Sequence, residues 1–460
     1  MLESIHWDAD LIRRYDQPGP RYTSYPTAVQ FHPGVGPFEL FHALRDSRKA
    51  LRPLSLYVHI PFCAHICYYC ACNKVITKDR SRSEPYLQRL IHEIEIIGRH
   101  LDHDQVLEQL HFGGGTPTFL DHAQLRRLMS ELRRNFNLLS DDSADYSIEI
   151  DPREADWATM GLLRELGFNR VSLGVQDLDP AVQRAVNRLQ TLEETRAIVD
   201  AARTLQYRSV NIDLIYGLPK QTPDSFARTV EEVIALQPDR LSVFNYAHLP
   251  ERFMPQRRIS KDDLPSPADK LSMLHGTIVQ LQRAGYRHIG MDHFALPDDD
   301  LAIAQEEGLL QRNFQGYTTH GHCDLIGFGV SAISHVGTLY CQNSSDIAEY
   351  QASLDSGQLA TCRGLHSSVD DAVRAEVIQR LMCDFRLDFA AIEERFELYF
   401  RSYFAELWPQ LQAMADDGLI ELSDRAIRVR PAGRLLVRAV SMLFDNYLNP
   451  QENLRYSRVI

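Results

Sequence analysis

Residues 54–72 read LSLYVHIPFCAHICYYCAC, and the architecture of the chain can be worked out from them. Leu54, Leu56, Val58 and Ile60 alternate with more polar residues. This period of two is typical of a β-strand with one face turned toward a core. The predicted strand ends where a run of cysteines begins. Four of the chain's 8 cysteines therefore follow one strand directly.

The four cysteines are Cys63, Cys67, Cys70 and Cys72, and their spacing indicates an iron–sulfur site. Cys70 and Cys72, two residues apart, would point in opposite directions in an extended segment, so all four are not expected to meet at one ion. The first three can wrap a cluster in one short loop. Three ligands on a four-iron cluster leave one iron open, as catalysis requires. A zinc site and a disulfide pair are the alternatives.

The length and composition of the chain are those of a globular protein. The 460 residues are enough for one large domain and a smaller one, and 44% apolar and 24% charged content is ordinary for a globular chain. A net charge of −13 argues against a general nucleic-acid or membrane-surface binder. We expect no signal peptide, no membrane span and a cytoplasmic location, because the apolar runs are short and the thiols are clustered as ligands.

Strand-like and helix-like segments alternate from about residue 54 to residue 290. Such alternation predicts parallel βα units around a curved sheet. Six strands rather than eight predict an α/β fold built as a partial, open (β/α)6 barrel. After 54–60, the predicted strands are 106–112, 146–150, 171–175, 210–216 and 241–246. The predicted helices are 85–100, 121–136, 157–166, 180–206 and 223–236.

Unusual residues gather at the carboxyl ends of these strands, where folds of this kind build their sites. This coincidence predicts a single active site at that edge of the sheet. The residues, in strand order, are the cysteines, Gly113–Thr116, Glu149 with Asp151, Gln176 and Ala247, and Asp213 lies on the fifth strand itself.

Beyond about residue 365 the pattern becomes mainly helical, with a hairpin predicted at 419–430 in a winged-helix-like arrangement. Five arginines make this region locally basic, although acidic residues lie among them. A solvated face is the preferred interpretation, and DNA binding is the weaker one. The arginines are Arg425, Arg428, Arg430, Arg434 and Arg438.

The C-x3-C-x2-C loop after a strand resembles that of the radical S-adenosylmethionine enzymes. Its extension by Cys72, and the residues 57–62 before it, resemble the oxygen-independent coproporphyrinogen III oxidases. The resemblance covers nearly the whole chain, from 19–27 (GPRYTSYPT) to 457–460 (SRVI). It implies an N-terminal arm (1–40) that closes over the site, a catalytic partial barrel (41–365) and a helical C-terminal domain (366–460).

The resemblance also assigns the site. It makes Cys63, Cys67 and Cys70 the ligands of one [4Fe–4S] cluster, with Tyr57 and Glu149 as further catalytic residues. It implies two S-adenosylmethionine molecules, the second beside Tyr69, where the family commonly has phenylalanine. The residues assigned to cofactor binding are Tyr57, Tyr69, Cys72, Gly114, Gly115, Thr116, Glu149, Gln176, Arg188, Asp213, Ala247, Phe314, Gln315 and Ile333.

The implied reaction converts two propionates of coproporphyrinogen III to vinyl groups, giving protoporphyrinogen IX, through a 5′-deoxyadenosyl radical. An external electron donor and acceptor and a monomeric enzyme are expected. A haem-binding chaperone is the first alternative, but such relatives lack both the fourth cysteine and the 19–27 arm. A radical methyltransferase and an iron–sulfur DNA-binding regulator are further alternatives.

Three remaining motifs are open to more than one interpretation. Residues 327–332 (GFGVSA) satisfy a nucleotide-binding pattern, but we interpret them as close packing that leads to Ile333. His320, His322 and Cys323 are spaced like metal ligands, but without an obvious fourth ligand coincidence is preferred. Arg21 is our hypothesis for a contact to one substrate propionate, because arginine forks match carboxylates.

Overall fold

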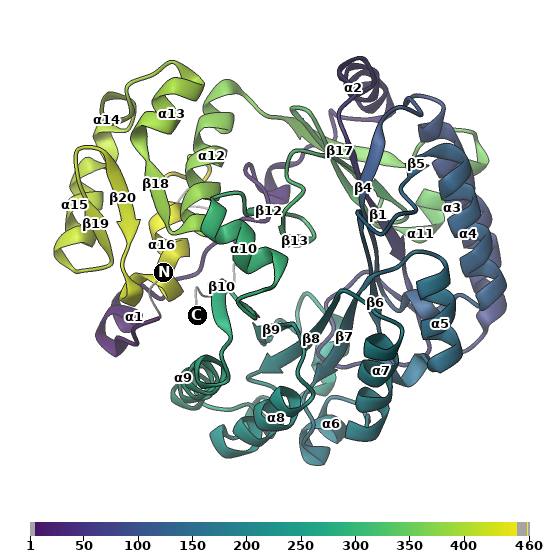
Figure 1. Ribbon diagram of the computed structural model, residues 1–460, viewed down its shortest axis with the longest axis horizontal. Helices are drawn as coiled ribbons and strands as arrows, with labels where there is room; N and C mark the ends of the chain where they lie inside the picture. Colours follow the sequence, from purple (N-terminus) through teal and green to yellow (C-terminus); the bar gives the residue numbers. More distant parts are fainter. Residues whose placement is uncertain (1–4, 449–457, 459–460) are drawn as a thin grey trace. The chain divides into compact units, whose positions relative to one another are not determined.

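The computed structural model describes residues 5–448 and residue 458 (Figure 1). Ser457, Val459 and Ile460 of the C-terminal motif lie outside the described residues. The chain forms two compact units. The barrel unit is Phe31–Gln280 with His322–His366, and the terminal unit is Met1–Gln30, Leu281–Gly321 and Ser367–Ile460. None of the described helices is long and apolar enough to cross a bilayer.

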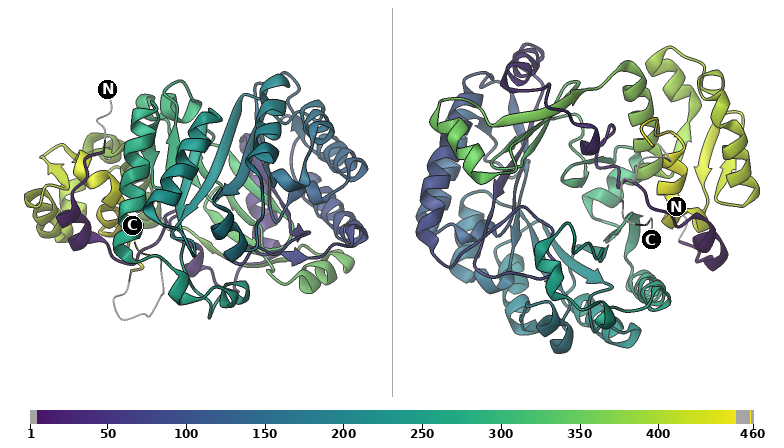
Figure 2. Two further views of the ribbon diagram at one scale, coloured as in Figure 1. Left: turned by 90° about the horizontal axis from the view of Figure 1, so that it is seen from below. Right: turned by 180° about the vertical axis from the view of Figure 1, so that it is seen from behind.

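The barrel unit is built on a curved parallel sheet, which confirms the predicted partial (β/α)6 barrel. Its strands follow the order β9-β8-β7-β6-β4-β1, and helices cover the outer face (Figure 1). The view from behind in Figure 2 shows the same layering. The strands are β1 (Leu54–Ile60), β4 (Val106–Gly114), β6 (Asp145–Ile150), β7 (Arg170–Gln176), β8 (Ser209–Tyr216) and β9 (Arg240–Asn245). The helices are α3 (Ser83–Gly98), α4 (His122–Asn135), α5 (Trp157–Glu165), α6 (Pro180–Ala185), α7 (Leu192–Thr204) and α8 (Pro223–Ala235).

Four further strands extend this sheet beyond β1, and the sequence did not predict them. β14 (Asp324–Phe328) pairs in parallel with β1, and β15 (Ile333–Val336), β16 (Leu339–Asn343) and β17 (Thr361–His366) follow antiparallel. The glycine-rich run before Ile333 makes the tight approach that we expected. A Cβ at Gly327 would lie only 2.5 Å from the carbonyl oxygen of Ile333.

The single helix predicted for 180–206 is wrong, because the segment divides into α6 and α7. Asn187 adopts a positive φ of 55° between them. Thr191 then begins α7 through a reciprocal cap with Glu194. The Gln183 amide donates to the Gln190 carbonyl at 2.7 Å and closes the intervening turn. The turn brings the Arg188 guanidinium to 3.6 Å from the sulfur of Cys67.

The terminal unit contains the C-terminal domain and the N-terminal segment. The predicted hairpin is confirmed: β19 (Ile420–Leu422) and β20 (Ala426–Val429) pair antiparallel, with β18 (Arg386–Asp388) on the other side of β20. Its main helices are α1 (Ala9–Tyr15), α10 (Asp300–Glu307), α12 (Val369–Asp384), α13 (Phe389–Phe396), α15 (Trp408–Asp416) and α16 (Val437–Met442).

Two of the five arginines in this unit do not belong to a solvated face, which corrects our interpretation. Arg434 and Arg438 are buried, whereas Arg425, Arg428 and Arg430 are exposed. The Arg438 guanidinium donates to the carbonyl oxygens of Gly19 and Pro20. These bonds hold the N-terminal segment against its own unit, so Arg438 is a structural residue.

A buried carboxyl group supports the sheet beside β1. Glu93 on α3 accepts hydrogen bonds from the Tyr350 hydroxyl (2.7 Å), the Gly329 amide (2.8 Å) and the Asn343 side chain (2.6 Å). Burial nevertheless raises the pKa of Glu93 to about 7, although the three hydrogen bonds oppose the shift. The folded protein therefore favours the protonated form of this group.

Glu93→Gln is expected to change how stability depends on pH. A raised folded-state pKa means that the wild type loses stability as pH rises from about 4.5 to about 7, since the proton is retained only in the folded state. The variant lacks this loss, so the difference in unfolding free energy should move in its favour by about 3 kcal/mol across that window. Urea unfolding at several pH values measures the effect. A difference that stays constant with pH would contradict the account.

Candidate active site

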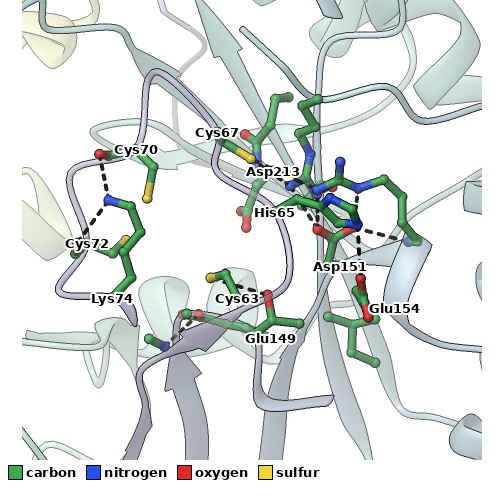
Figure 3. A pocket seen from close by; sticks show the side chains of 18 of the residues that line it. Cys63, His65, Cys67, Cys70, Cys72, Lys74, Glu149, Asp151, Glu154 and Asp213 are labelled. Carbon is green, nitrogen blue, oxygen red and sulfur yellow. Dashed lines mark hydrogen bonds and ion pairs between the residues drawn. The ribbon is translucent and has the colours of Figure 1, made fainter. Parts of the chain in front are cut away.

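The cysteine loop leaves the carboxyl end of β1 and is closed by a short strand pair. β2 (Phe62–Cys63) pairs in parallel with β3 (Val75–Ile76), so the loop between them is held at both ends. Figure 3 shows Cys63, Cys67 and Cys70 around one cavity, which has a volume of about 300 Å³. All eight cysteines are free thiols in this structure.

The pKa values of the Cys63 and Cys70 thiols shift in opposite directions. Burial is the main reason that the pKa of Cys63 rises to about 12, although the Thr116 hydroxyl, 3.6 Å from its sulfur, opposes the shift. The pKa of Cys70 falls to about 6, mainly through a hydrogen bond from Cys72. Lys74 also contributes, and its ammonium donates to the carbonyl oxygens of Cys70 and Cys72 at 3.0 and 3.2 Å. The loop is thus prepared to present a thiolate.

The glycine run Gly113–Gly115, whose first two residues end β4, lies directly against the start of the cysteine loop. The amides of Gly115 and Thr116 donate to the carbonyl oxygens of Ile60 and Phe62, both at 2.8 Å. A Cβ at Gly115 would lie 2.7 Å from the Phe62 carbonyl oxygen. The close approach of the Phe62 backbone therefore requires glycine at position 115, whether or not a ligand is bound.

Gly115→Ala is expected to shift the backbone at Pro61–Phe62, because the added methyl group meets main-chain atoms that cannot move aside alone. We expect reduced cluster incorporation, measured as iron and sulfide per chain. Gly161→Ala is the matched control, since nothing lies within 4 Å of its Cβ position in α5. That variant should load normally and gain up to about 1 kcal/mol of helix stability. Equal loading of both variants would contradict this role of Gly115.

Two carboxyl groups line the cavity, Glu149 on β6 and Asp213 on β8, with β7 between these strands, and their pKa values shift in opposite directions. Burial raises the pKa of Asp213 to about 6, with the charge of Glu149 as the next cause. Burial also opposes ionisation of Glu149, but hydrogen bonds from His111 and from the Gly114 amide (3.1 Å) lower its pKa below the usual value. Such a pair can accept hydrogen bonds from the amines and hydroxyls of a bound ligand.

Two arginines with little exposure, Arg153 and Arg188, lie beside the Asp151 carboxylate near the cysteine loop. The Arg188 guanidinium lies 3.1 Å from Asp151 and 3.6 Å from the Cys67 sulfur. Arg153 binds the same Asp151 carboxylate at 2.6 Å. Neighbouring cations of this kind stabilise thiolate or cluster charge in a site with little water.

Tyr57 and His59 lie on one face of β1 and hold the far end of the cysteine loop. The His59 Nε2 lies 3.0 Å from the Asn73 carbonyl oxygen, which can only accept a hydrogen bond. Burial lowers the pKa of His59, so its neutral ring places the proton on Nε2. The Tyr57 hydroxyl, 3.0 Å from Nδ1, must then donate to His59.

Most of the residues assigned from sequence meet in this one cavity. Tyr57 stacks on His111, with ring centroids 5.8 Å apart, behind the lining. Among the described residues, the lining does not include Ala247 or Ile333, and Phe314 and Gln315 belong to the terminal unit. The assigned residues that line the cavity are Cys63, Cys67, Tyr69, Cys70, Cys72, Gly114, Gly115, Thr116, Glu149, Gln176, Arg188 and Asp213.

Sequence reasoning missed several residues of the site. His59 shares the strand face of Tyr57, so the period of two could have indicated it. Lys74 and Arg153 left no comparable signal, because their positions depend on how the loops fold. The other unassigned lining residues include His65, Glu154, Ser172 and Phe244.

Comparison with known proteins shows which protein families have similar sequences and folds. Residues 57–233 match the Radical SAM superfamily and residues 368–436 match the HemN C-terminal domain. The fold, cysteine loop and superfamily match together define a radical S-adenosylmethionine (radical SAM) protein.

The full-length relatives are more specific. The chain is 74% identical to oxygen-independent coproporphyrinogen III oxidase of Pseudomonas aeruginosa and 50% identical to that of Escherichia coli, with all of each chain covered. The solved structure of coproporphyrinogen III oxidase (HemN) from Escherichia coli, described as a radical SAM enzyme, matches with a TM-score of 0.92 and 49% identity, covering 97% of this chain and 100% of the other. The chain belongs to the oxygen-independent coproporphyrinogen III oxidase family.

The residues present fit the cofactors of such an enzyme, a [4Fe–4S] cluster and S-adenosylmethionine. Three free thiols converge, and the cavity volume lies at the lower end of the range for small-molecule sites. The buried Nε of Arg188 has no hydrogen-bond partner among the described residues, so it can serve a bound group.

Proposed function

We propose that this chain catalyses the oxygen-independent oxidative decarboxylation of two propionate side chains of coproporphyrinogen III, giving protoporphyrinogen IX. The observation that carries the proposal is the three-cysteine loop at the carboxyl end of β1, in a chain 74% identical to a named oxidase of this kind. Cys63, Cys67 and Cys70 would hold the cluster, which would supply the reducing electron for radical chemistry with S-adenosylmethionine.

The chain's own residues perform the binding and positioning. Cys63, Cys67 and Cys70 hold the cluster, and the bare backbone of the Gly113–Gly115 run admits a ligand beside it. Glu149 accepts hydrogen bonds as an ionised carboxylate, while Asp213, whose pKa is raised to about 6, can donate a hydrogen bond when it is protonated at mildly acidic pH. Fixed polar groups of this kind orient reactants without reorganisation during the reaction.

A second S-adenosylmethionine is part of the proposal. Tyr69 and Cys72 line the same cavity as the cluster ligands, and we assign Phe314 and Gln315 to this second molecule. Ala247 and Ile333 are assigned as backbone or packing contacts. The electron donor and acceptor are external, the enzyme works as a monomer, and its place is the cytoplasm.

The N-terminal arm is proposed to close over the site when substrate binds. Arg21 on this arm forms an ion pair with Asp292. A substrate propionate can replace Asp292 as the partner of the guanidinium, because both present a carboxylate.

Arg21→Ala is expected to raise the KM for coproporphyrinogen III by about 10-fold, which corresponds to one lost charge-assisted contact, and to leave cluster absorbance intact. Asp292→Asn is the matched variant, since it breaks the same ion pair and retains the guanidinium. Its KM should stay the same or fall. Equal increases in both variants would show that the ion pair only anchors the arm.

The test of the proposed function is anaerobic turnover of the reconstituted protein with dithionite, S-adenosylmethionine, coproporphyrinogen III and a cell extract that supplies an acceptor. We expect protoporphyrin and 5′-deoxyadenosine by chromatography. Tight haem binding with neither product would support the chaperone instead. Deoxyadenosine with a methylated product would support a methyltransferase.

A further inference from the structure

Three metal-ligating side chains meet at the opposite end of the barrel strands from the cysteine loop. Glu108 lies near the start of β4, and His322 and Cys323 directly precede β14. Leu54, the first residue of β1, pairs with Leu107 on β4 and with Asp324 on β14. The group therefore spans β1 at its amino-terminal end, whereas the cysteine loop follows its carboxyl end.

The ligand atoms are already close enough for one ion. The Glu108 Oε2 lies 2.7 Å from the His322 Nε2 and 3.5 Å from the Cys323 sulfur. One ligand atom from each of the three residues can be chosen so that all lie within 4.8 Å of one another. Tetrahedral zinc with ordinary bond lengths places its ligand atoms roughly 3.4–3.7 Å apart. The carboxylate–thiol pair already has this spacing, and the histidine–carboxylate pair has to open by about 0.7 Å.

We propose that Glu108, His322 and Cys323 form a metal site for one divalent ion of the zinc class, separate from the cluster site. Imidazole, thiolate and carboxylate are the three ligand types of protein zinc sites. The backbone around the site is fixed by the sheet, and the Asp324 amide donates to the Pro53 carbonyl at 2.9 Å. The His322 side chain is 57% exposed, so an ion can enter from solvent and a water can complete the tetrahedron.

Binding exchanges existing hydrogen bonds for metal–ligand bonds. The Cys323 thiol now donates to Glu108, and its proton leaves to solvent when the sulfur binds the ion. The metal then ties β4 to β14 across β1. Its role is structural, because it stiffens the base of the strands that carry the glycine run and the cysteine loop. This site does not depend on the proposed reaction.

The experiment is metal titration of the holoenzyme with its cluster loaded, using Zn²⁺ for stoichiometry and Co²⁺ as a spectroscopic probe. We expect one ion per chain beyond the cluster iron, a cobalt–thiolate charge-transfer band and a higher melting temperature with zinc. Cys323→Ala should lose the band, and His322→Ala and Glu108→Gln should weaken binding by at least about 10-fold.

Matched controls separate this site from other thiols and imidazoles. Cys362→Ala and His103→Ala remove exposed residues of the same types outside the group and should bind as the wild type does. Circular dichroism and cluster absorbance show that each variant is folded and loaded. If Cys323→Ala does not fold, the test uses the cobalt band in Glu108→Gln, which should need a higher cobalt concentration to appear than it does in the wild type. A band unchanged in the site variants, cobalt bound only with loss of cluster iron, or no ion bound by the wild type would overturn the proposal.

Discussion

Cys70→Ser is expected to abolish turnover, with a loss of at least about 10³-fold, because the chain then retains only two of three thiolate ligands for the cluster. A hydrogen bond from Cys72, together with other neighbours, lowers the pKa of the replaced Cys70 thiol to about 6, so the variant removes a group already prepared to bind iron as a thiolate. Iron content, the absorbance of the oxidised cluster and electron paramagnetic resonance of the reduced protein measure the effect. Cys63→Ser and Cys67→Ser should behave in the same way.

Cys72→Ser is the control that tests the ligand assignment. Cys72 lies in the same loop and cavity, but we assign it to the second S-adenosylmethionine and not to the cluster. Its variant should keep the cluster absorbance and iron content of the wild type, whatever its turnover. A cluster that is lost with Cys72 and retained without Cys70 would show that the loop binds iron with a different set of thiols.

Asp151→Asn is expected to lower the stability of the barrel unit by about 3–5 kcal/mol, because it leaves two buried guanidiniums without their carboxylate. The side chains of Arg153 and Arg188 are only 13% and 8% exposed. Burial opposes ionisation of Asp151, but the charges of Arg188 and Arg153 lower its pKa. The stabilisation is therefore complete above about pH 4, the usual pKa of aspartate, and is lost as pH falls further through the folded-state value.

Urea unfolding of the anaerobic protein at pH 7 and at lower pH measures this difference. Glu165→Gln is the matched control, because it breaks an ion pair with Arg126 whose side chains are 61% and 51% exposed. Such a surface pair contributes less than about 1 kcal/mol. The account of Asp151 fails if both variants lose equal stability, or if the loss for Asp151→Asn grows below pH 4.

The barrel and its cluster loop could be predicted because each signal was local. The alternation at 54–60, the cysteine spacing, and the positions of Glu149 and Gln176 near strand ends and of Asp213 within a strand are all signals from short stretches of sequence. Parallel strands then bring those ends to one edge, whatever the details of the connections. The domain boundaries and residue roles taken from the family resemblance stay predictions.

The features that sequence missed depend on contacts between distant segments. Arg434 and Arg438 looked like part of a solvated face, but three-dimensional packing buries them, and Arg438 donates to the carbonyl oxygens of Gly19 and Pro20. The break between α6 and α7 that delivers Arg188 left only a weak signal in the pattern. Glu108 could not be connected with His322 and Cys323 before the order of β4, β1 and β14 was known.

The most direct test of the central claim is to follow hydrogen from substrate to cofactor. Coproporphyrinogen III carrying deuterium on its propionate side chains would be turned over anaerobically, and the 5′-deoxyadenosine would be examined by mass spectrometry. The account predicts that its mass rises through transfer of one deuterium, while protoporphyrinogen IX forms. Protoporphyrinogen formation with unlabelled 5′-deoxyadenosine would contradict the proposed abstraction of a propionate hydrogen.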